Sequence, residues 1–124
     1  MLNIAGVGGR TPGPEFTIGG SVNAAVVTFT KALADLGVRD GVQVNAINPG
    51  YIRTDRFAAR LKARAAATGK TEAAIEAAIL AEEGIVRIGE PADVAGLVAY
   101  VTSAAGRYLQ GAVIDLDGGQ TKTV

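Results

Sequence analysis

The chain has 124 residues, 48% hydrophobic and 19% charged, so it can bury a core and does not have the composition of a disordered segment. Twelve basic residues balance twelve acidic ones and no apolar run could span a membrane, so we expect a cytoplasmic protein with no nucleic-acid or membrane partner. Because cysteine and histidine are absent, disulfides, thiolate nucleophiles and Ser-His-Asp chemistry are excluded, and we expect no metal site.

The N-terminal part of the chain alternates between strand and helix patterns. A short apolar run at residues 2–5 predicts a buried strand, and the glycines and prolines of VGGRTPGPEF predict a loop after it. Residues 21–36 then show the three-to-four-residue period of an amphipathic helix, with Gly37 as a plausible stop. The expected apolar stripe of this helix is Ala25, Phe29, Leu33 and Leu36. VQVNAIN predicts a second strand that ends at Asn48.

The C-terminal part predicts helices followed by one more strand. Residues 55–83 favour two helices, or one bent helix, with Thr71 capping the second. GEPADVAGLVAYV predicts a helix with Pro91 in its first turn. Its expected buried face is Val94, Leu97, Val98 and Val101. Residues 112–116 predict the last strand. The alternation of strands and helices indicates an α/β fold with a parallel sheet and right-handed crossovers.

The glycines after the first strand suggest a dinucleotide-binding loop, but the motif is incomplete. Gly6 and Gly8 have the correct spacing, whereas Thr11 stands where a third glycine is needed. Pro12 and Pro14 disfavour the helix that should follow at once. We therefore interpret this segment as an ordinary loop.

The segment NPGYIRT, after the second strand, is a stronger candidate for ligand contact. Ligands of open parallel sheets bind beyond the carboxyl ends of the strands, where this segment is expected. Pro49 and Gly50 let the backbone turn close to a flat ligand without a side chain between them. Ile52 offers an N–H and an apolar wall, and Thr54 offers a hydroxyl. The alternative is a simple strand-to-helix connection capped by Thr54 or Asp55, and both interpretations can hold together.

The remaining charged residues have less specific interpretations. A group of cations in the next helix is expected on its surface or in a substrate loop: Arg56, Arg60, Lys62 and Arg64. Asp115 and Asp117 point to the same side of the last strand. They could form a paired-carboxylate site, although a strand end entering a turn explains them as well.

Five segments together resemble the C-terminal half of a short-chain dehydrogenase/reductase. They are LNIAGVGGR, SVNAAVVTFTKALA, VQVNAINPGYIRTD, RIGEPADVAGLVAYVTS and LQGAVIDLDGG, in the order and spacing of that family. The resemblance implies the C-terminal half of a doubly wound parallel-sheet (Rossmann-type) fold, about three strands with flanking helices. Residues 1–124 would then be a partial NAD(P)-binding domain without its N-terminal phosphate-binding half.

The same resemblance implies that NAD or NADP lies across the carboxyl ends of the strands. The residues that match the family's nicotinamide-lining segment are Pro49, Gly50, Ile52 and Thr54. Asn23 could hydrogen-bond the cofactor ribose. Residues 55–83 resemble the mobile lid over the substrate, so substrate choice is expected there.

The family's catalytic residues do not carry over. Its serine falls at Gly6, its tyrosine at Gly19 and its lysine at Asn23, and none of the three can perform the family's acid–base step. The nearest conceivable substitutes are Phe16, Ser21, Tyr51 and Thr54. Among these only Tyr51 has a phenol, and its neighbours suggest packing, so the catalytic residues stay unknown.

The sequence thus predicts a fragment of an NAD(P)-dependent oxidoreductase for a small-molecule carbonyl or alcohol, inactive by itself. The alternatives are a non-catalytic subunit or nucleotide-sensing or structural protein, and a truncated product without independent function. The resemblance also implies oligomer contacts through the 21–36 helix and the C-terminal strand. Because the first strand would form an exposed sheet edge, we expect a homo-oligomer that uses these contacts.

Overall fold

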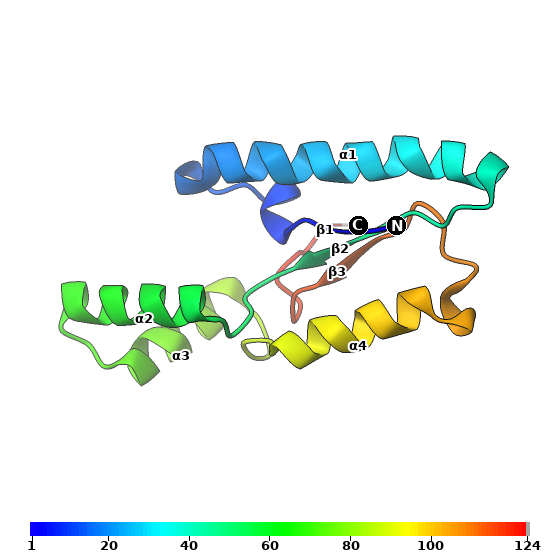
Figure 1. The fold of residues 1–124 in the computed structure, drawn as a ribbon. Coiled ribbons are helices and arrows are strands. Elements are labelled where there is room, and N and C mark those ends of the chain that lie inside the picture. Colours follow the sequence, from blue (N-terminus) through cyan, green and yellow to red (C-terminus); the bar gives the residue numbers. More distant parts are fainter. Residues whose placement is uncertain (124) are drawn as a thin grey trace.

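The computed structural model describes residues 1–123 and shows an α/β fold with helices on both faces of a three-stranded parallel sheet (Figure 1). The strands are β1 (Leu2–Ile4), β2 (Asn45–Pro49) and β3 (Val113–Leu116), in the order β1-β2-β3. The helices are α1 (Thr17–Asp40), α2 (Asp55–Thr68), α3 (Glu72–Glu83) and α4 (Pro91–Thr102). Short 3-10 turns occupy Val7–Gly9, Pro14–Phe16 and Ala104–Gly106. The predicted fold class is confirmed.

The central strand β2 holds the sheet together. Asn45 to Asn48 are fully buried, because strands pair with β2 on both edges and helices cover both faces. The parallel register aligns Ile4 with Ile47 and Asn48 with Asp115. Figure 1 shows α1 on one face of the sheet and α4 on the other, while α2 and α3 project beyond it.

Helix α1 is longer than the predicted 21–36 helix and does not stop at Gly37. It ends at Gly41, whose left-handed φ of 68° is the helix-terminating conformation that glycine favours. Gly37 has a different role, because a Cβ at this position would lie 2.2 Å from the carbonyl oxygen of Val42. The glycine therefore lets the chain turn back closely against the helix.

The predicted apolar stripe of α1 is not its buried face. Phe29 and Leu36 are exposed at 56% and 47%, whereas the small residues Thr30 and Ala34 are buried against the sheet. Thr30 Oγ1 accepts a hydrogen bond of 2.9 Å from Asn3 Nδ2 of β1. Small side chains bring the helix close to the strands, so the larger apolar ones remain on the outer side.

Helices α2 and α3 form a hairpin with its own apolar cluster. Thr71 caps α3 as predicted, by accepting a hydrogen bond of 3.2 Å from the N–H of Ala74. The cluster comprises Phe57, Leu61, Ala65, Ile75, Ile79, Ile85 and Ile88. The cluster gives the hairpin and the segment after it a small apolar core of their own.

Helix α4 follows the prediction closely. Pro91 is its first residue, and the N–H of Glu90 donates a hydrogen bond of 2.7 Å to Asp93 Oδ2. All four predicted face residues are at least partly buried, and Val101 is fully buried.

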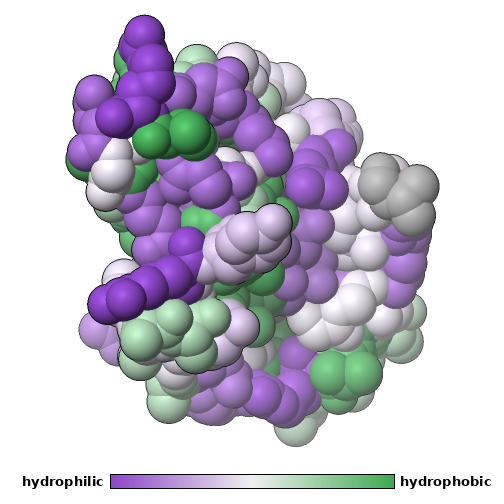
Figure 2. All heavy atoms as spheres, turned by 90° about the vertical axis from the view of Figure 1, so that its right-hand side faces the viewer, coloured by the Kyte–Doolittle hydropathy of each residue, from purple (hydrophilic) through white to green (hydrophobic). Residues whose placement is uncertain are grey.

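Amide side chains close the end of the sheet that lies opposite the α2–α3 hairpin. Gln43 Nε2 donates to the carbonyl oxygens of Gly106 at 2.7 Å and Leu109 at 2.9 Å, and Gln110 Nε2 donates to that of Ala34 at 2.6 Å. Figure 2 shows that hydrophilic side chains cover much of this end, with smaller separate hydrophobic areas. Among residues 1–123, no helix has the length and hydropathy needed to cross a membrane.

Candidate cofactor-binding site

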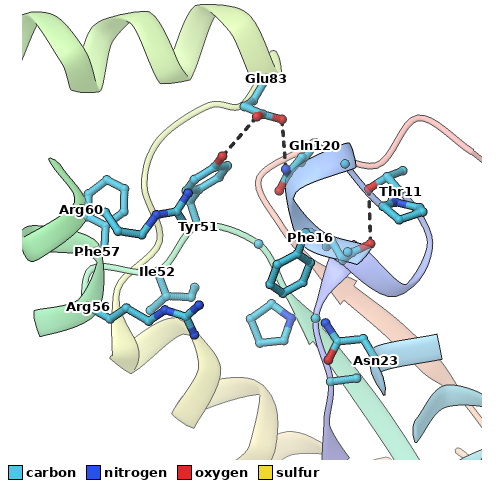
Figure 3. Close-up of a pocket in the computed structure, with 18 of the residues that line it drawn as sticks. Thr11, Phe16, Asn23, Tyr51, Ile52, Arg56, Phe57, Arg60, Glu83 and Gln120 are labelled. Atoms are coloured by element: carbon cyan, nitrogen blue, oxygen red, sulfur yellow. Dashed lines mark hydrogen bonds between the residues drawn. The ribbon is translucent and has the colours of Figure 1, made fainter. Parts of the chain in front are cut away.

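A pocket of about 1050 Å³ lies beyond the carboxyl ends of the strands, under the α2–α3 hairpin (Figure 3). The segments that follow β1, β2 and β3 all contribute to it, together with α1 and α2. All five candidate cofactor-binding residues line this one pocket: Asn23, Pro49, Gly50, Ile52 and Thr54. The fold therefore brings together residues that are up to 31 positions apart in the sequence, from 23 to 54.

The loop between β2 and α2 is held in place by its neighbours. Its Arg53 N–H donates to the Gly89 carbonyl at 2.7 Å, and the Gly89 N–H donates to the Tyr51 carbonyl at 2.9 Å. These two bonds flank Ile52, whose own N–H makes no hydrogen bond within residues 1–123 and lies in the pocket wall. A free N–H beside an apolar side chain suits a flat, polar ring such as a carboxamide-bearing nicotinamide.

Glycine is required at position 50 by packing against another segment. The sequence interpretation instead placed a ligand beside this glycine. A Cβ at position 50 would lie 2.8 Å from Asp117 Cβ and 3.0 Å from Gln120 Oε1. The side of Gly50 without a side chain therefore faces the turn after β3, and not a ligand. Glycine at this position lets the β2–α2 loop approach that turn.

Thr54 serves as the cap that one of the two sequence interpretations proposed. Its Oγ1 accepts a hydrogen bond of 3.3 Å from the Phe57 N–H and so caps α2. The hydroxyl hydrogen stays available for a ligand, because capping uses only the oxygen lone pairs. Capping and ligand contact are thus compatible, and the cap fixes the hydroxyl at the edge of the pocket.

Asn23 of α1 lies beside Gly6, and both residues line the pocket. A Cβ at Gly6 would lie 3.0 Å from Asn23 Nδ2, so these two residues are neighbours across the pocket floor. The Asn23 amide makes no hydrogen bond within residues 1–123 (Figure 3). An unpaired amide that lines a pocket can donate to a ribose hydroxyl and accept from it.

Phe16 occupies the space next to Gly19. A Cβ at position 19 would lie 2.3 Å from Phe16 Cζ, and a Cβ at Gly8 would lie 2.8 Å from Phe16 Cδ1. The aromatic ring thus rests against two glycines and forms an apolar wall of the pocket. Neither Gly8 nor Gly19 could carry a side chain there without displacement of the ring.

Tyr51 is engaged in a structural contact. Its hydroxyl donates to Glu83 Oε1 at 3.1 Å, and the other carboxylate oxygen accepts from Gln120 Nε2 at 3.0 Å. This chain ties the end of α3 to the β2–α2 loop and to the C-terminal segment (Figure 3). Burial, followed by the nearby Glu83 carboxylate, raises the pKa of Tyr51 above its usual value. A raised pKa makes the phenol a poorer proton donor, so packing describes Tyr51 better than acid–base work.

Asp115 and Asp117 do not form a carboxylate pair. Asp115 accepts a hydrogen bond of 2.9 Å from Asn48 Nδ2 and lies 3.5 Å from Arg10 Nη1. Asp117 instead accepts from the backbone N–H groups of Gly119 and Thr121. Burial alone would raise the pKa of Asp117, but hydrogen bonds from residues 119–121 outweigh it and lower the pKa. These contacts agree with the second interpretation of the two aspartates, a strand end that enters a turn.

Sequence reasoning left several pocket residues without an assigned role: Phe57, Arg56, Arg60, Glu83 and Gln120. Phe57 packs edge-on against Tyr51, with ring centroids 6.1 Å apart. The sequence contained a signal that could have identified the two arginines as pocket residues. They stand two and six residues after Thr54, so they lie on one face of a helix that begins at the pocket.

The chain matches one family model and is similar to curated proteins. The family model described as "Enoyl-(Acyl carrier protein) reductase" matches residues 1–121. The cyclohexanol dehydrogenase of Rhodococcus sp. (strain TK6) is 39% identical over 103 residues, which are 82% of this chain and 34% of that protein. The chain spans less than half the length of the curated relatives it matches.

Two solved structures have the same fold as this chain over nearly its whole length. L-sorbose reductase from Gluconobacter frateurii, complexed with NADPH and L-sorbose, superposes with a TM-score of 0.93 at 27% identity, over 99% of this chain and 47% of that one. A 4-hydroxyisoleucine dehydrogenase complexed with NADH superposes with a TM-score of 0.79 at 26% identity, over 99% of this chain and 46% of that one.

Proposed function

The chain belongs to the short-chain dehydrogenase/reductase family, and we propose that it contributes the nicotinamide and substrate side of an NAD(P)-dependent oxidoreductase. Its substrate would be a small molecule with a carbonyl or hydroxyl group. The observation that carries the proposal is the convergence of Asn23 with residues 49–54 on one pocket at the carboxyl ends of the strands. Relatives complexed with NADPH and NADH support this choice of cofactor.

The residues present fit such a cofactor. The unpaired amide of Asn23 suits a ribose hydroxyl, while the Ile52 N–H and the Thr54 hydroxyl suit the polar edge of a nicotinamide. The nicotinamide would supply hydride transfer when bound. The chain's own residues would orient the ring, and the hairpin α2–α3 would exclude water from it.

We further propose that residues 1–124 do not catalyse by themselves. The positions that match the family's serine, tyrosine and lysine are Gly6, Gly19 and Asn23. The family's glycine-rich phosphate loop would come from a longer parent protein. In that parent we expect a cytoplasmic homo-oligomer, assembled through α1 and the C-terminal strand β3. Ile18, Val22 and Phe29 leave 81%, 56% and 56% of their surface exposed on α1, in support of such an assembly.

One observation favours a second candidate, a non-catalytic subunit or nucleotide-sensing protein. The ring of Phe16 fills the space at Gly19, so the site offers an apolar wall where the family places its proton donor. Such a site could bind a dinucleotide without turning it over.

A titration with NADH and NADPH, followed by nicotinamide fluorescence, tests the proposal. We expect saturable binding that weakens in the Asn23→Ala variant. No binding up to millimolar cofactor would count against a nicotinamide site in this chain. If binding is seen, turnover with a panel of carbonyl substrates separates the two candidates, because only the oxidoreductase consumes the cofactor.

A further inference from the structure

We propose that Arg56 and Arg60 together bind an oxyanion, a phosphate or carboxylate group of a molecule in the pocket. This inference deepens the proposed function and rests on it for the identity of the molecule, but not for the anion site itself. The two residues stand four positions apart in α2, so their side chains leave the helix from the same face. Both line the pocket.

The two guanidinium groups have no partner of their own. The arginines that form ion pairs within residues 1–123 are Arg10, Arg53, Arg64 and Arg87. Neither Arg56 nor Arg60 makes an ion pair or a side-chain hydrogen bond there. Figure 3 shows both side chains reaching from α2 toward the pocket. Two like charges on neighbouring turns repel each other, and a shared anion would remove that repulsion.

The acidic groups of the pocket form no ion pair with these two arginines within residues 1–123. Glu83 already accepts hydrogen bonds from Tyr51 and Gln120 through its two oxygens. Glu15, in the 3-10 turn Pro14–Phe16, also lines the pocket and forms no ion pair with either arginine within residues 1–123. The positive charge therefore stays available on the α2 side of the pocket.

The chemistry of arginine identifies the ligand class. A guanidinium presents a planar set of donors that matches the two oxygens of a carboxylate or phosphate. Two of them on one helix face suit a doubly charged group, such as a diphosphate, or two oxygens of a single anion. Two sources have this chemistry: the diphosphate of a dinucleotide cofactor, and an acidic group on the substrate.

The site is tested with two small anions, inorganic diphosphate and succinate, whose binding to the full chain is measured by titration calorimetry. We expect both to bind, and affinity to fall about tenfold or more in the Arg56→Gln/Arg60→Gln variant. The matched control is Lys62→Gln/Lys70→Gln, which removes the same charge from α2 and from the second residue after its end, outside the pocket lining. Thermal unfolding of both variants checks that they fold.

An NADH titration of the same proteins identifies the source of the anion. If the arginine variant loses NADH affinity and diphosphate competes with NADH, the anion is the cofactor diphosphate. If NADH binds the arginine variant unchanged and alongside diphosphate, the anion belongs to the substrate. The proposal is overturned if neither anion binds the natural chain, or if both bind the arginine variant and the control equally. Anion binding without NADH binding would sink the proposed function and leave this site standing.

Discussion

The ring of Phe16 and the α-carbon of Gly19 share one small space at the edge of the pocket, where a Cβ at position 19 would lie 2.3 Å from Phe16 Cζ. The position of the ring requires glycine at 19, because a larger residue there would displace it. The ring of Phe16 gives the pocket an apolar wall at this edge.

The coupling between these two residues can be measured. Gly19→Ala should destabilise the natural chain by about 1 kcal/mol, because the ring must move. In a Phe16→Ala background the same substitution should stabilise the chain by about 0.5–1 kcal/mol, because alanine then enters an open helical position. A double-mutant cycle of urea unfolding gives the coupling free energy. Equal effects of Gly19→Ala in both backgrounds would show that the ring does not fill this space in solution.

Two helical glycines should respond to alanine with opposite signs. Gly37→Ala should destabilise the chain by about 2 kcal/mol or more, since its Cβ would lie 2.2 Å from the backbone oxygen of Val42. Gly96 in α4 has nothing within 4 Å of its Cβ position. Gly96→Ala should therefore stabilise the chain, by about 0.5–1 kcal/mol. Thermal or urea unfolding compares the two variants, and a stable Gly37→Ala protein would contradict the close approach of α1 and residue 42.

Alanine substitutions of the two threonine N-caps distinguish an effect on stability from an effect on ligand binding. Thr54→Ala and Thr71→Ala each remove an N-cap hydroxyl, and each should lower the free energy of unfolding by about 1 kcal/mol. Only Thr54 lines the pocket. We therefore expect weaker binding of NADH in Thr54→Ala alone, measured by nicotinamide fluorescence. If both variants bind NADH as the natural chain does, the Thr54 hydroxyl is a cap and nothing more.

Asp93 should contribute to stability in a defined range of pH. The hydrogen bond from Arg87, followed by that from the Glu90 N–H, lowers the pKa of Asp93 from 3.8 to about 2. Because the carboxylate is favoured in the folded state, its contribution is present above pH 3.8 and is lost as the pH falls toward 2. Denaturant unfolding between pH 5 and 2 should show a shallower loss of stability for Asp93→Asn than for the natural chain. Parallel curves would mean that the Arg87–Asp93 contact does not persist in solution.

Local sequence signals predicted most of the elements. Pro91 with Asp93 predicted the start of α4, and Thr71 predicted that of α3, because a capping side chain acts within a few residues of itself. The strands followed from short apolar runs between turn residues. The candidate residues after β2 could be placed at the carboxyl edge of the sheet, since parallel topology puts all strand ends on one side.

The predictions that were wrong are those that depend on a contact with another segment of the chain. The stripe containing Phe29 and Leu36 looked like a buried face, but periodicity cannot tell which side of a helix meets the sheet. Gly37 looked like a helix stop and proved to be a close contact with Val42. In both cases the deciding atoms belong to another segment.

By itself, the sequence determined the type and order of the elements and the family, because these depend on residue identity and short-range pattern. Only the tertiary structure decided that Phe16 fills the space at Gly19, that Glu83 engages Tyr51, and that the two arginines of α2 face the pocket unpaired. These facts depend on packing between segments that are distant in the chain. No local signal encodes the separation of two side chains that meet only after the sheet and the hairpin have formed.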